Sequence, residues 1–454
     1  MRVAIDTHGC RLNRFESDAM AQALSRAGHV LVDEPEQAEV YVLNSCTITH
    51  QADADARRAV RRARRANPQV RVVLTGCLAN AEPEPAAALP GVDAVLGNAD
   101  KGALAEVLAR LPREGESPLV SVRALTRRMP FTPLSPAVAP RRARGLLKVQ
   151  DGCNYRCAFC IVPRVRGASR SLPVAEVITQ ARAMVEAGVP ELVLTGVHLG
   201  TYGRDLRPRQ RLSDLVAALL PHLGAARLRL SSIDPHEVDD ALLELLAAHP
   251  RTICRHLHLP VQAADDGVLR RMRRGHTAQT FATLVQRAVA RIPGLAVGSD
   301  VIVGHPGEDQ AAFERGQARL AALPLAYLHV FPFSPRRGTA AAAMRDQVDA
   351  EQRRVRGQHL RALSDRFVAA RRRAAAVQVV DAVVHRRSRR DGRYEALTDD
   401  YLRVVLPPGM DDRAGQRLWL RLGADGHQAE PCGSPHDGQS IAAIRVAHRQ
   451  AHGG

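Results

Sequence analysis

One stretch decides the fold: Gly152-Cys153-Asn154-Tyr155-Arg156-Cys157-Ala158-Phe159-Cys160. It follows the mostly apolar run Leu146–Val149 and carries three thiols on one short loop. Three thiolates bind three irons of a [4Fe–4S] cube, whereas clusters that only carry electrons are usually held by four cysteines. The C-x3-C-x2-C spacing therefore predicts a cluster with one open iron, to which a substrate can bind.

Other uses of three cysteines fit this stretch less well. A structural zinc site takes four nitrogen or sulfur ligands, and no further Cys or His occurs within thirty residues after Cys160. A disulfide framework is typical of short secreted chains, and this chain has 454 residues with only eight cysteines. The cysteine usage instead favours metal thiolates in a reducing compartment.

The composition points to a polyanionic partner. The formal net charge is +17 and the isoelectric point is about 10.5, which favours RNA or DNA binding. No run approaches the ~18 consecutive apolar residues of a membrane span. No signal-peptide pattern is recognised at Met1–Asp6, so we expect a cytoplasmic protein that does not bind membranes.

The first segment, residues 1–123, alternates strand-like and helix-like stretches. Such alternation predicts an α/β fold with a doubly wound parallel sheet. The expected strands are Arg2–Asp6, Val40–Leu43, Val70–Thr75 and Val92–Leu96, and the expected helices are Phe15–Ala27 and Ala52–Ala66.

Three further cysteines recur at matching places in this pattern. Cys10, Cys46 and Cys77 each follow the carboxyl end of a predicted strand. Ligands of open α/β sheets bind at that edge, so the three thiols are expected to converge. Free cysteines are often small core residues, but these three stand in loop-like contexts just past the strands. We therefore predict a second three-cysteine cluster.

A Pro-, Ser- and Arg-rich stretch begins near Glu114, and we place a linker at 124–140. Residues 141–370 then repeat strand and helix patterns, which predicts a partial (β/α) barrel with its site at the carboxyl ends of the strands. The expected strands are Leu146–Gln150, Leu192–Gly196, Leu228–Ser232, His256–Val261, Ala296–Gly304 and Tyr327–Phe333.

The last segment, residues 371–447, follows an Arg-rich helix at Arg353–Arg373 and contains only short strand-like runs. Five short strands fit a small β barrel, a shape that often holds RNA. These strands are Val377–Val384, Tyr394–Leu397, Leu402–Leu406, Leu418–Leu422 and Ile441–Val446. Residues 448–454 are predicted to be a disordered tail.

With both cysteine triplets in place, the chain resembles the radical S-adenosylmethionine (SAM) methylthiotransferases over nearly its whole length. The resemblance implies an N-terminal three-cysteine domain, a radical SAM barrel and a C-terminal RNA-binding TRAM domain. It rests on Gly9-Cys10-Arg11-Leu12-Asn13, Asn44-Ser45-Cys46-Thr47, Gly76-Cys77, the Cys153–Gly167 block and Ser334-Pro335-Arg336-Arg337-Gly338-Thr339.

The family has three branches. Two modify the adenosine 3′ of the tRNA anticodon, and one modifies an aspartate of a ribosomal protein. The stretches Thr195–Gly203, Arg229–Ile233 and His256–Pro260 look like the N6-threonylcarbamoyladenosine branch. The isopentenyladenosine branch usually has a Gln-Asn pair at Val197-His198. The turn Leu397–Tyr401 departs from the family because it lacks the glycine common in TRAM domains.

The resemblance implies methylthiolation of C2 of N6-threonylcarbamoyladenosine at position 37, with two [4Fe–4S] clusters and SAM as cofactors. Cys153, Cys157 and Cys160 would hold the catalytic cluster, and Cys10, Cys46 and Cys77 the auxiliary one. The expected partners are the anticodon stem-loop of tRNA and a flavodoxin or ferredoxin reductant; the oligomeric state stays open.

Small residues at the barrel strand ends are candidate SAM contacts. The same residues serve equally well as plain turns. They are Thr195, Gly196, Ser231, Ser232 and Gly304.

Arg164, Arg166 and Arg170 follow the cluster loop and are expected to meet RNA phosphates. Three alternatives stay open: a methylthiotransferase acting on isopentenyladenosine or on a ribosomal protein aspartate, a different radical SAM enzyme, and a non-catalytic iron–sulfur protein that binds RNA or senses redox state.

Overall fold

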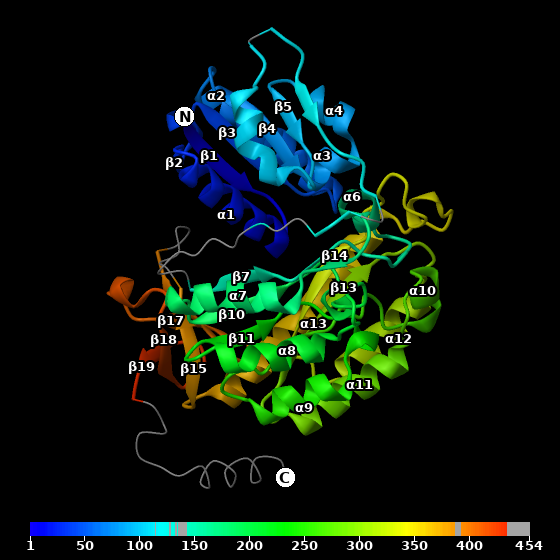
Figure 1. Cartoon of the computed structure of the whole chain (residues 1–454). Coiled ribbons are helices and arrows are strands. Elements are labelled where there is room, and N and C mark those ends of the chain that lie inside the picture. Colours follow the sequence, from blue (N-terminus) through cyan, green and yellow to red (C-terminus); the bar gives the residue numbers. More distant parts are fainter. Residues whose placement is uncertain (114, 127–128, 132–133, 135–142, 386–391, 434–454) are drawn as a thin grey trace.

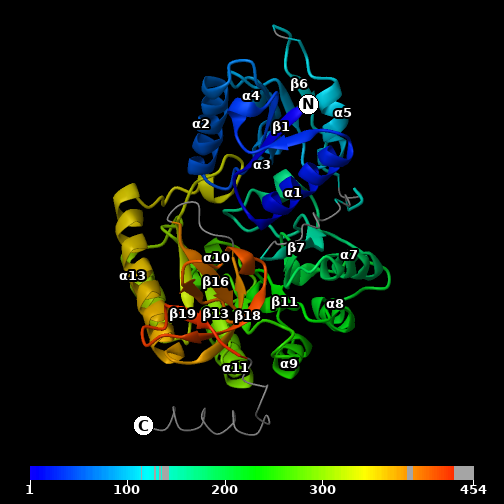
Figure 2. The same ribbon diagram turned by 90° about the vertical axis from the view of Figure 1, so that its left-hand side faces the viewer.

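The computed structural model describes residues 1–113, 115–126, 129–131, 134, 143–385 and 392–433. An N-terminal sheet lies above a strand-and-helix barrel, and a small C-terminal sheet packs against the side of that barrel (Figure 1, Figure 2). Among the described residues, no helix is both long and apolar enough to cross a membrane.

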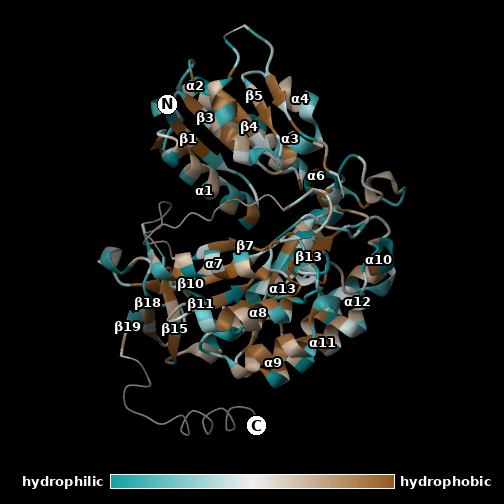
Figure 3. Ribbon diagram, in the orientation of Figure 1, coloured by the Kyte–Doolittle hydropathy of each residue, from teal (hydrophilic) through white to brown (hydrophobic). Residues whose placement is uncertain are grey.

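The N-terminal sheet has six parallel strands in the order β2-β1-β3-β4-β5-β6. Its central strand β3 is buried along its whole length, as expected for a parallel sheet covered on both faces, and Figure 3 shows the apolar character of these strands. The strands are β1 (Arg2–Thr7), β2 (Val30–Val32), β3 (Val40–Ser45), β4 (Arg71–Gly76), β5 (Ala94–Leu96) and β6 (Leu119–Ser121).

Helices cover both faces of this sheet, which confirms the doubly wound prediction. Met20 of α1 and Leu104 of α5 pack on one face, and Val60 of α2 and Leu78 of α3 pack on the other. These helices are α1 (Arg11–Arg26), α2 (His50–Ala66), α3 (Cys77–Ala81), α4 (Pro83–Ala87) and α5 (Leu104–Ala109), with short 3-10 turns η1 (Pro35–Gln37) and η2 (Lys101–Ala103).

The sequence patterns missed two edge strands of this sheet. Strand β2 pairs with β1, and β6 pairs with β5 within the Pro-rich stretch that begins near Glu114. Both have only three residues, too few to show a period. These two strands form because they pair with a neighbouring strand, and no local sequence pattern reveals them.

The central segment forms the predicted partial barrel. Two three-stranded parallel sheets, β7-β10-β11 and β12-β13-β14, are joined by a bridge between Leu228 and Ile253. All six predicted strands are present: β7 (Gly145–Lys148), β10 (Glu191–Thr195), β11 (Arg227–Leu230), β12 (His256–His258), β13 (Ala296–Val303) and β14 (Tyr327–Pro332).

Alternate side chains of the barrel strands face the surrounding helices. Leu192, Leu194 and Leu228 lie in the largest apolar cluster, so their strand neighbours point to the opposite face. The helices are α6 (Val162–Arg166), α7 (Val174–Glu186), α8 (Leu212–Leu219), α9 (Asp240–Ala248), α10 (Asp266–Arg271), α11 (Ala278–Arg291), α12 (Gln310–Ala321) and α13 (Ala350–Ala375), with 3-10 turns η3 (Leu199–Thr201), η4 (Leu220–His222), η5 (Pro235–Glu237) and η6 (Ala341–Ala343).

The C-terminal sheet is antiparallel, in the order β17-β16-β15-β18-β19. A bridge between Val405 and Gln428 brings its two ends together into a nearly closed barrel. The predicted strand Ile441–Val446 and the tail 448–454 lie outside the described residues. Among the described residues this sheet has five strands: β15 (Val379–Val384), β16 (Tyr394–Thr398), β17 (Arg403–Leu406), β18 (Arg417–Leu422) and β19 (Ala429–Pro431), with η7 (Asp411–Arg413).

A buried ion pair joins this sheet to the barrel. Glu191 is fully buried and accepts hydrogen bonds from Arg227 at 2.8 Å and Arg229 at 2.7 Å. The two guanidinium groups also donate to main-chain carbonyls across the interface, those of Asp381, Leu397, Thr398 and Asp399, at 2.9–3.0 Å.

Tyr401 connects all three parts of the structure. It has a φ of 71°, a left-handed backbone conformation that glycine adopts far more readily than other residues. Its ring stacks on His256 at 4.3 Å between centroids, and its hydroxyl accepts a hydrogen bond from Arg11 at 3.0 Å.

We expect Glu191→Gln to lower the free energy of unfolding by about 3–5 kcal/mol, because it leaves two buried arginines without their carboxylate. Urea denaturation measures this loss. Glu351→Gln, which breaks an exposed pair with Arg354, is the control and should change little. Equal midpoints for wild type and Glu191→Gln would show that the interface does not depend on this pair.

Candidate functional site

The central cysteine triplet lies on a loop whose two ends are held together. A short antiparallel pair, β8 (Gln150–Asp151) and β9 (Arg170–Ser171), closes the loop. Gly152 has a φ of 71°, and a side chain there would collide with the carbonyl of Ala168. Only glycine lets the strands approach so closely, and the loop then presents its thiols at the barrel mouth.

The three cysteines line a cavity of about 160 Å³ at the carboxyl ends of the barrel strands. Its walls combine the cluster loop with the ends of β10, β11 and β12. The lining residues are Cys153, Tyr155, Cys157, Phe159, Cys160, Val162, Val197, His198, Ser232, Asp234, Pro260, Gln262 and Arg274.

Two cationic or titratable groups contact the thiols directly. Arg274 Nη1 lies 3.4 Å from Cys157 Sγ, and His198 Nδ1 lies 3.4 Å from Cys153 Sγ. Tyr155 stacks on His198 with ring centroids 4.5 Å apart. The role of Arg274 was not predicted from the sequence. Four arginines lie between positions 270 and 274, and no sequence periodicity distinguishes one of them from the others.

A carboxylate pair holds these groups in place. Asp234 pairs with Arg274 and lies 2.6 Å from His236 Nδ1, while the Tyr155 hydroxyl donates to Glu237 at 2.6 Å. The hydrogen bonds to Asp234 and Glu237 raise the pKa of His236 to about 9. His236 is therefore protonated at neutral pH.

Burial holds the thiols in their neutral form. It raises the pKa of Cys153 to about 11 and that of Cys160 to about 12. In the N-terminal sheet it raises the pKa of Cys46 to about 12 and also raises that of Cys77. Metal binding must therefore displace protons from these thiols, because a metal takes the thiolate.

The N-terminal cysteines converge as predicted. Cys10 precedes α1, Cys46 follows β3 and Cys77 begins α3. A side chain on Gly9 would lie 2.8 Å from Cys46 Cβ, and a negative charge on Cys10 or Cys77 would raise the pKa of the Cys46 thiol further. The three thiols thus gather at the carboxyl edge of the sheet.

Helix α6 links the two triplets. Cys77 packs with Ile161 and Val165, which lie one and five residues after Cys160 in the chain. Asn98 donates to the carbonyl of Val165 at 2.8 Å from the N-terminal side. Helix α6, which follows the central triplet, therefore packs against the N-terminal triplet.

The candidate SAM contacts differ in where they lie relative to the cavity. Ser232 lines the cavity, and Thr195 is buried at the end of β10 with its hydroxyl bonded to Val193 O at 3.1 Å. Gly196 packs on Gln150, 2.9 Å from where a side chain would start. Gly304 donates its N–H to Glu308 at 2.6 Å and is covered by Arg353.

The expectation that Arg166 meets RNA phosphates is wrong, because this side chain is 2% exposed and bound inside the protein. Arg170 is also largely buried, with its side chain 11% exposed. Only Arg164 of the three lies on the surface. Inspection of the sequence cannot distinguish a buried arginine from a solvated one when both follow the same loop.

Two family models match the chain. Residues 2–97 match Uncharacterized protein family UPF0004, and residues 147–315 match the Radical SAM superfamily. The threonylcarbamoyladenosine tRNA methylthiotransferase MtaB of Bacillus subtilis is 36% identical over 92% of this chain and 93% of its own. MtaB of Aquifex aeolicus is 34% identical over 80% and 87%.

The chain belongs to the radical SAM methylthiotransferase family. Methylthiotransferases named for dimethylallyladenosine or for ribosomal protein uS12 also match, at 33–35% identity. A radical SAM methyltransferase structure, TsrM of Kitasatospora setae, superposes with a TM-score of 0.54 over 73% of this chain and 74% of its own, at 16% identity. That likeness concerns the fold alone.

Radical SAM membership implies an iron–sulfur cluster and SAM, and the residues at the cavity fit both. Three thiols stand at its mouth with Arg274 beside them, a cation suited to an anionic cluster. The Ser231 hydroxyl is buried at the end of β11, and the described residues offer it no hydrogen-bond partner. A polar ligand in this methylthiotransferase would satisfy it.

The raised pKa of His236 gives a pH-dependent contribution to stability. An unfolded histidine titrates near ~6.5, so the stabilisation by protonated His236 is complete below about pH 6.5 and is lost as pH rises through about 9. We expect the melting temperature of the metal-free protein to fall more across this range in wild type than in His236→Gln. Scanning calorimetry tests this, and parallel curves would contradict it.

Proposed function

We propose that this methylthiotransferase converts N6-threonylcarbamoyladenosine at position 37 of tRNA to its 2-methylthio derivative. The observation that carries the proposal is the pair of three-cysteine sites linked by α6, which follows Cys160 and packs against Cys77. Two relatives named for this substrate match most of the chain, and Val197-His198 stands where the isopentenyladenosine branch usually has Gln-Asn.

We assign 1–123 to the auxiliary-cluster domain, 124–140 to a linker, 141–370 to the radical SAM domain and 371–447 to TRAM.

Two [4Fe–4S] clusters are proposed, one on Cys153, Cys157 and Cys160 and one on Cys10, Cys46 and Cys77. With a cluster and SAM bound, Cys153, Cys157 and Cys160 would hold radical chemistry able to remove an unactivated aromatic hydrogen, which protein acids and bases cannot do at neutral pH. Ser232 lines the cavity and is a polar group that would meet SAM, as would the Ser231 hydroxyl beside it, while Phe159, Val162 and Pro260 give the cavity an apolar wall.

The RNA side of the proposal rests on charge and shape. A net charge of +17 favours a polyphosphate partner, and the nearly closed C-terminal barrel offers a platform for RNA. An anticodon loop is already unpaired, so presenting its base costs less than flipping one out of a duplex. We place the protein in the cytoplasm with tRNA, and expect a flavodoxin or ferredoxin as reductant.

Deleting the gene should remove 2-methylthio-N6-threonylcarbamoyladenosine from tRNA and leave its unthiolated precursor in its place. Mass spectrometry of digested tRNA measures both nucleosides. Loss of the 2-methylthio isopentenyl nucleoside would assign the protein to the isopentenyladenosine branch. An unchanged tRNA profile would refute the proposal and direct the search to ribosomal protein uS12.

Alanine variants separate the two cysteine triplets. Cys157→Ala should abolish SAM cleavage, because it removes a ligand of the catalytic cluster. Cys46→Ala should keep SAM cleavage and abolish methylthiolation. Chromatographic detection of 5′-deoxyadenosine and of the modified nucleoside reads both steps, with iron content measured alongside. Cys254→Ala is the control, since that buried thiol lies beside Glu191, outside both triplets. Methylthiolation by Cys46→Ala at the wild-type rate would refute the mechanism.

A further inference from the structure

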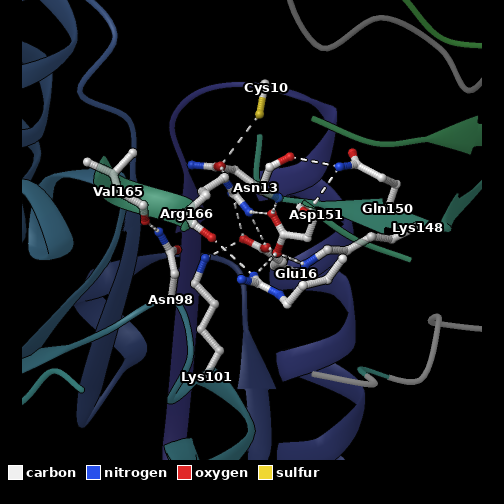
Figure 4. A network of polar contacts seen from close by, with 12 residues as sticks. Cys10, Asn13, Glu16, Asn98, Lys101, Lys148, Gln150, Asp151, Val165 and Arg166 are labelled. Carbon is white, nitrogen blue, oxygen red and sulfur yellow. Dashed lines mark hydrogen bonds and ion pairs between the residues drawn. The ribbon is translucent and has the colours of Figure 1, made fainter. Parts of the chain in front are cut away.

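A buried network of charges lies between the N-terminal sheet and the barrel (Figure 4). At its centre is Glu16 of α1, whose side chain is 1% exposed. It pairs with Lys101, with Arg166 at 2.7 Å and with Lys148 at 3.0 Å. Lys101 belongs to the N-terminal segment, whereas Lys148 and Arg166 belong to the barrel, so one carboxylate bridges two parts of the chain.

The network reaches toward both cysteine triplets. On one side, Arg166 Nη2 donates to Asn13 Oδ1 at 2.9 Å, and the same oxygen lies 3.6 Å from Cys10 Sγ. On the other, Asp151 pairs with Lys148 at 2.7 Å and with Arg166 at 3.2 Å, and stands two residues before Cys153. Arg166 itself closes α6, the helix that separates the triplets.

Cations exceed carboxylates in this network. Lys101, Lys148 and Arg166 oppose Glu16 and Asp151, with Arg170 at the margin 3.7 Å from Asp151. Burial disfavours the Glu16 carboxylate, but the three cations outweigh it and hold the pKa of Glu16 well below its usual range. Arg166 also acts on the Cys77 thiol. The surplus positive charge thus lies beside the auxiliary cysteines, where an anionic cluster would bind.

We propose that the Glu16 network is a positioning element that fixes the auxiliary-cluster loop relative to the radical SAM loop. This inference rests on the proposed function, in which sulfur carried on one triplet must meet a carbon radical formed at the other. Reaction between two held groups requires their alignment. SAM cleavage needs only the central triplet, so the network serves sulfur transfer and not radical formation.

Two variants test the network with opposite changes of charge. Glu16→Gln leaves three cations against one carboxylate and removes the bridging charge. Lys148→Met leaves two cations and two carboxylates, and Glu16 keeps its pairs with Arg166 and Lys101. If the fold does not tolerate the first variant, Arg166→Lys gives the same test, since lysine cannot span Glu16, Asp151 and Asn13 together.

The first measurement is hydrogen exchange of the metal-free protein, followed by mass spectrometry. Glu16→Gln should speed exchange of peptides spanning 8–17 and 162–167 by about tenfold or more, because breaking a buried pair costs several kcal/mol. Lys148→Met should speed their exchange less than Glu16→Gln does, because Glu16 keeps Lys101 and Arg166 and the charges of the network then balance. Glu191→Gln is the matched control, a buried carboxylate with two arginines at the other interface, and should speed exchange of peptides 8–17 and 162–167 less than Glu16→Gln does.

The second measurement is the ratio of methylthiolated RNA to 5′-deoxyadenosine in the reconstituted enzyme. We expect Glu16→Gln to lower this ratio by about tenfold or more while SAM cleavage stays within about threefold of wild type, and Glu191→Gln to keep the wild-type ratio. An unchanged ratio with unchanged exchange would overturn the inference, as would a parallel loss of both products with faster exchange everywhere. If wild type cleaves SAM but makes no methylthiolated RNA, the proposed function fails, and the cofactor-free exchange comparison still tests the link between the loops.

Discussion

A charge that leaves water must find its partner inside the protein, and this constraint joins the three parts of the molecule. Glu16 gathers cations from the N-terminal segment and the barrel. Glu191 gathers two arginines that reach across to the C-terminal sheet. Glu16 meets Lys148 and Arg166 only when the barrel is in place, and the two arginines on Glu191 find their carbonyl partners only when the C-terminal sheet is in place.

The topology of the sheet and the barrel explains where the thiols lie. Strand ends at the carboxyl edges of a parallel sheet and of a barrel bring loops from distant sequence positions together. Gly76, with a φ of 98°, turns the chain from β4 straight into the helix that begins with Cys77. Helix α6 follows the central triplet and places Arg166 against the N-terminal segment, so both cysteine sites are in contact with this helix.

Much of this was predictable from sequence because it depends on local patterns. The six barrel strands, the doubly wound sheet and both cysteine triplets follow from period, turn chemistry and spacing. Three-residue strands such as β6 and β19 were missed because only their neighbours define them. The expectation that Arg166 binds RNA was wrong, and the role of Glu16 was not predicted. These two side chains are buried and pair with each other across 150 residues of sequence, and no local sequence pattern reveals such a contact. The SAM contacts at the strand ends remain predictions.

The hydrogen bonds from Arg227 and Arg229 to the C-terminal sheet have a consequence for which of its residues can vary. Both arginines hold main-chain carbonyls, which every residue type supplies alike. The captured turn must keep its backbone course, but most of its side chains are left unspecified by this contact. Substitutions on the outer surface of the sheet should therefore leave this attachment unchanged.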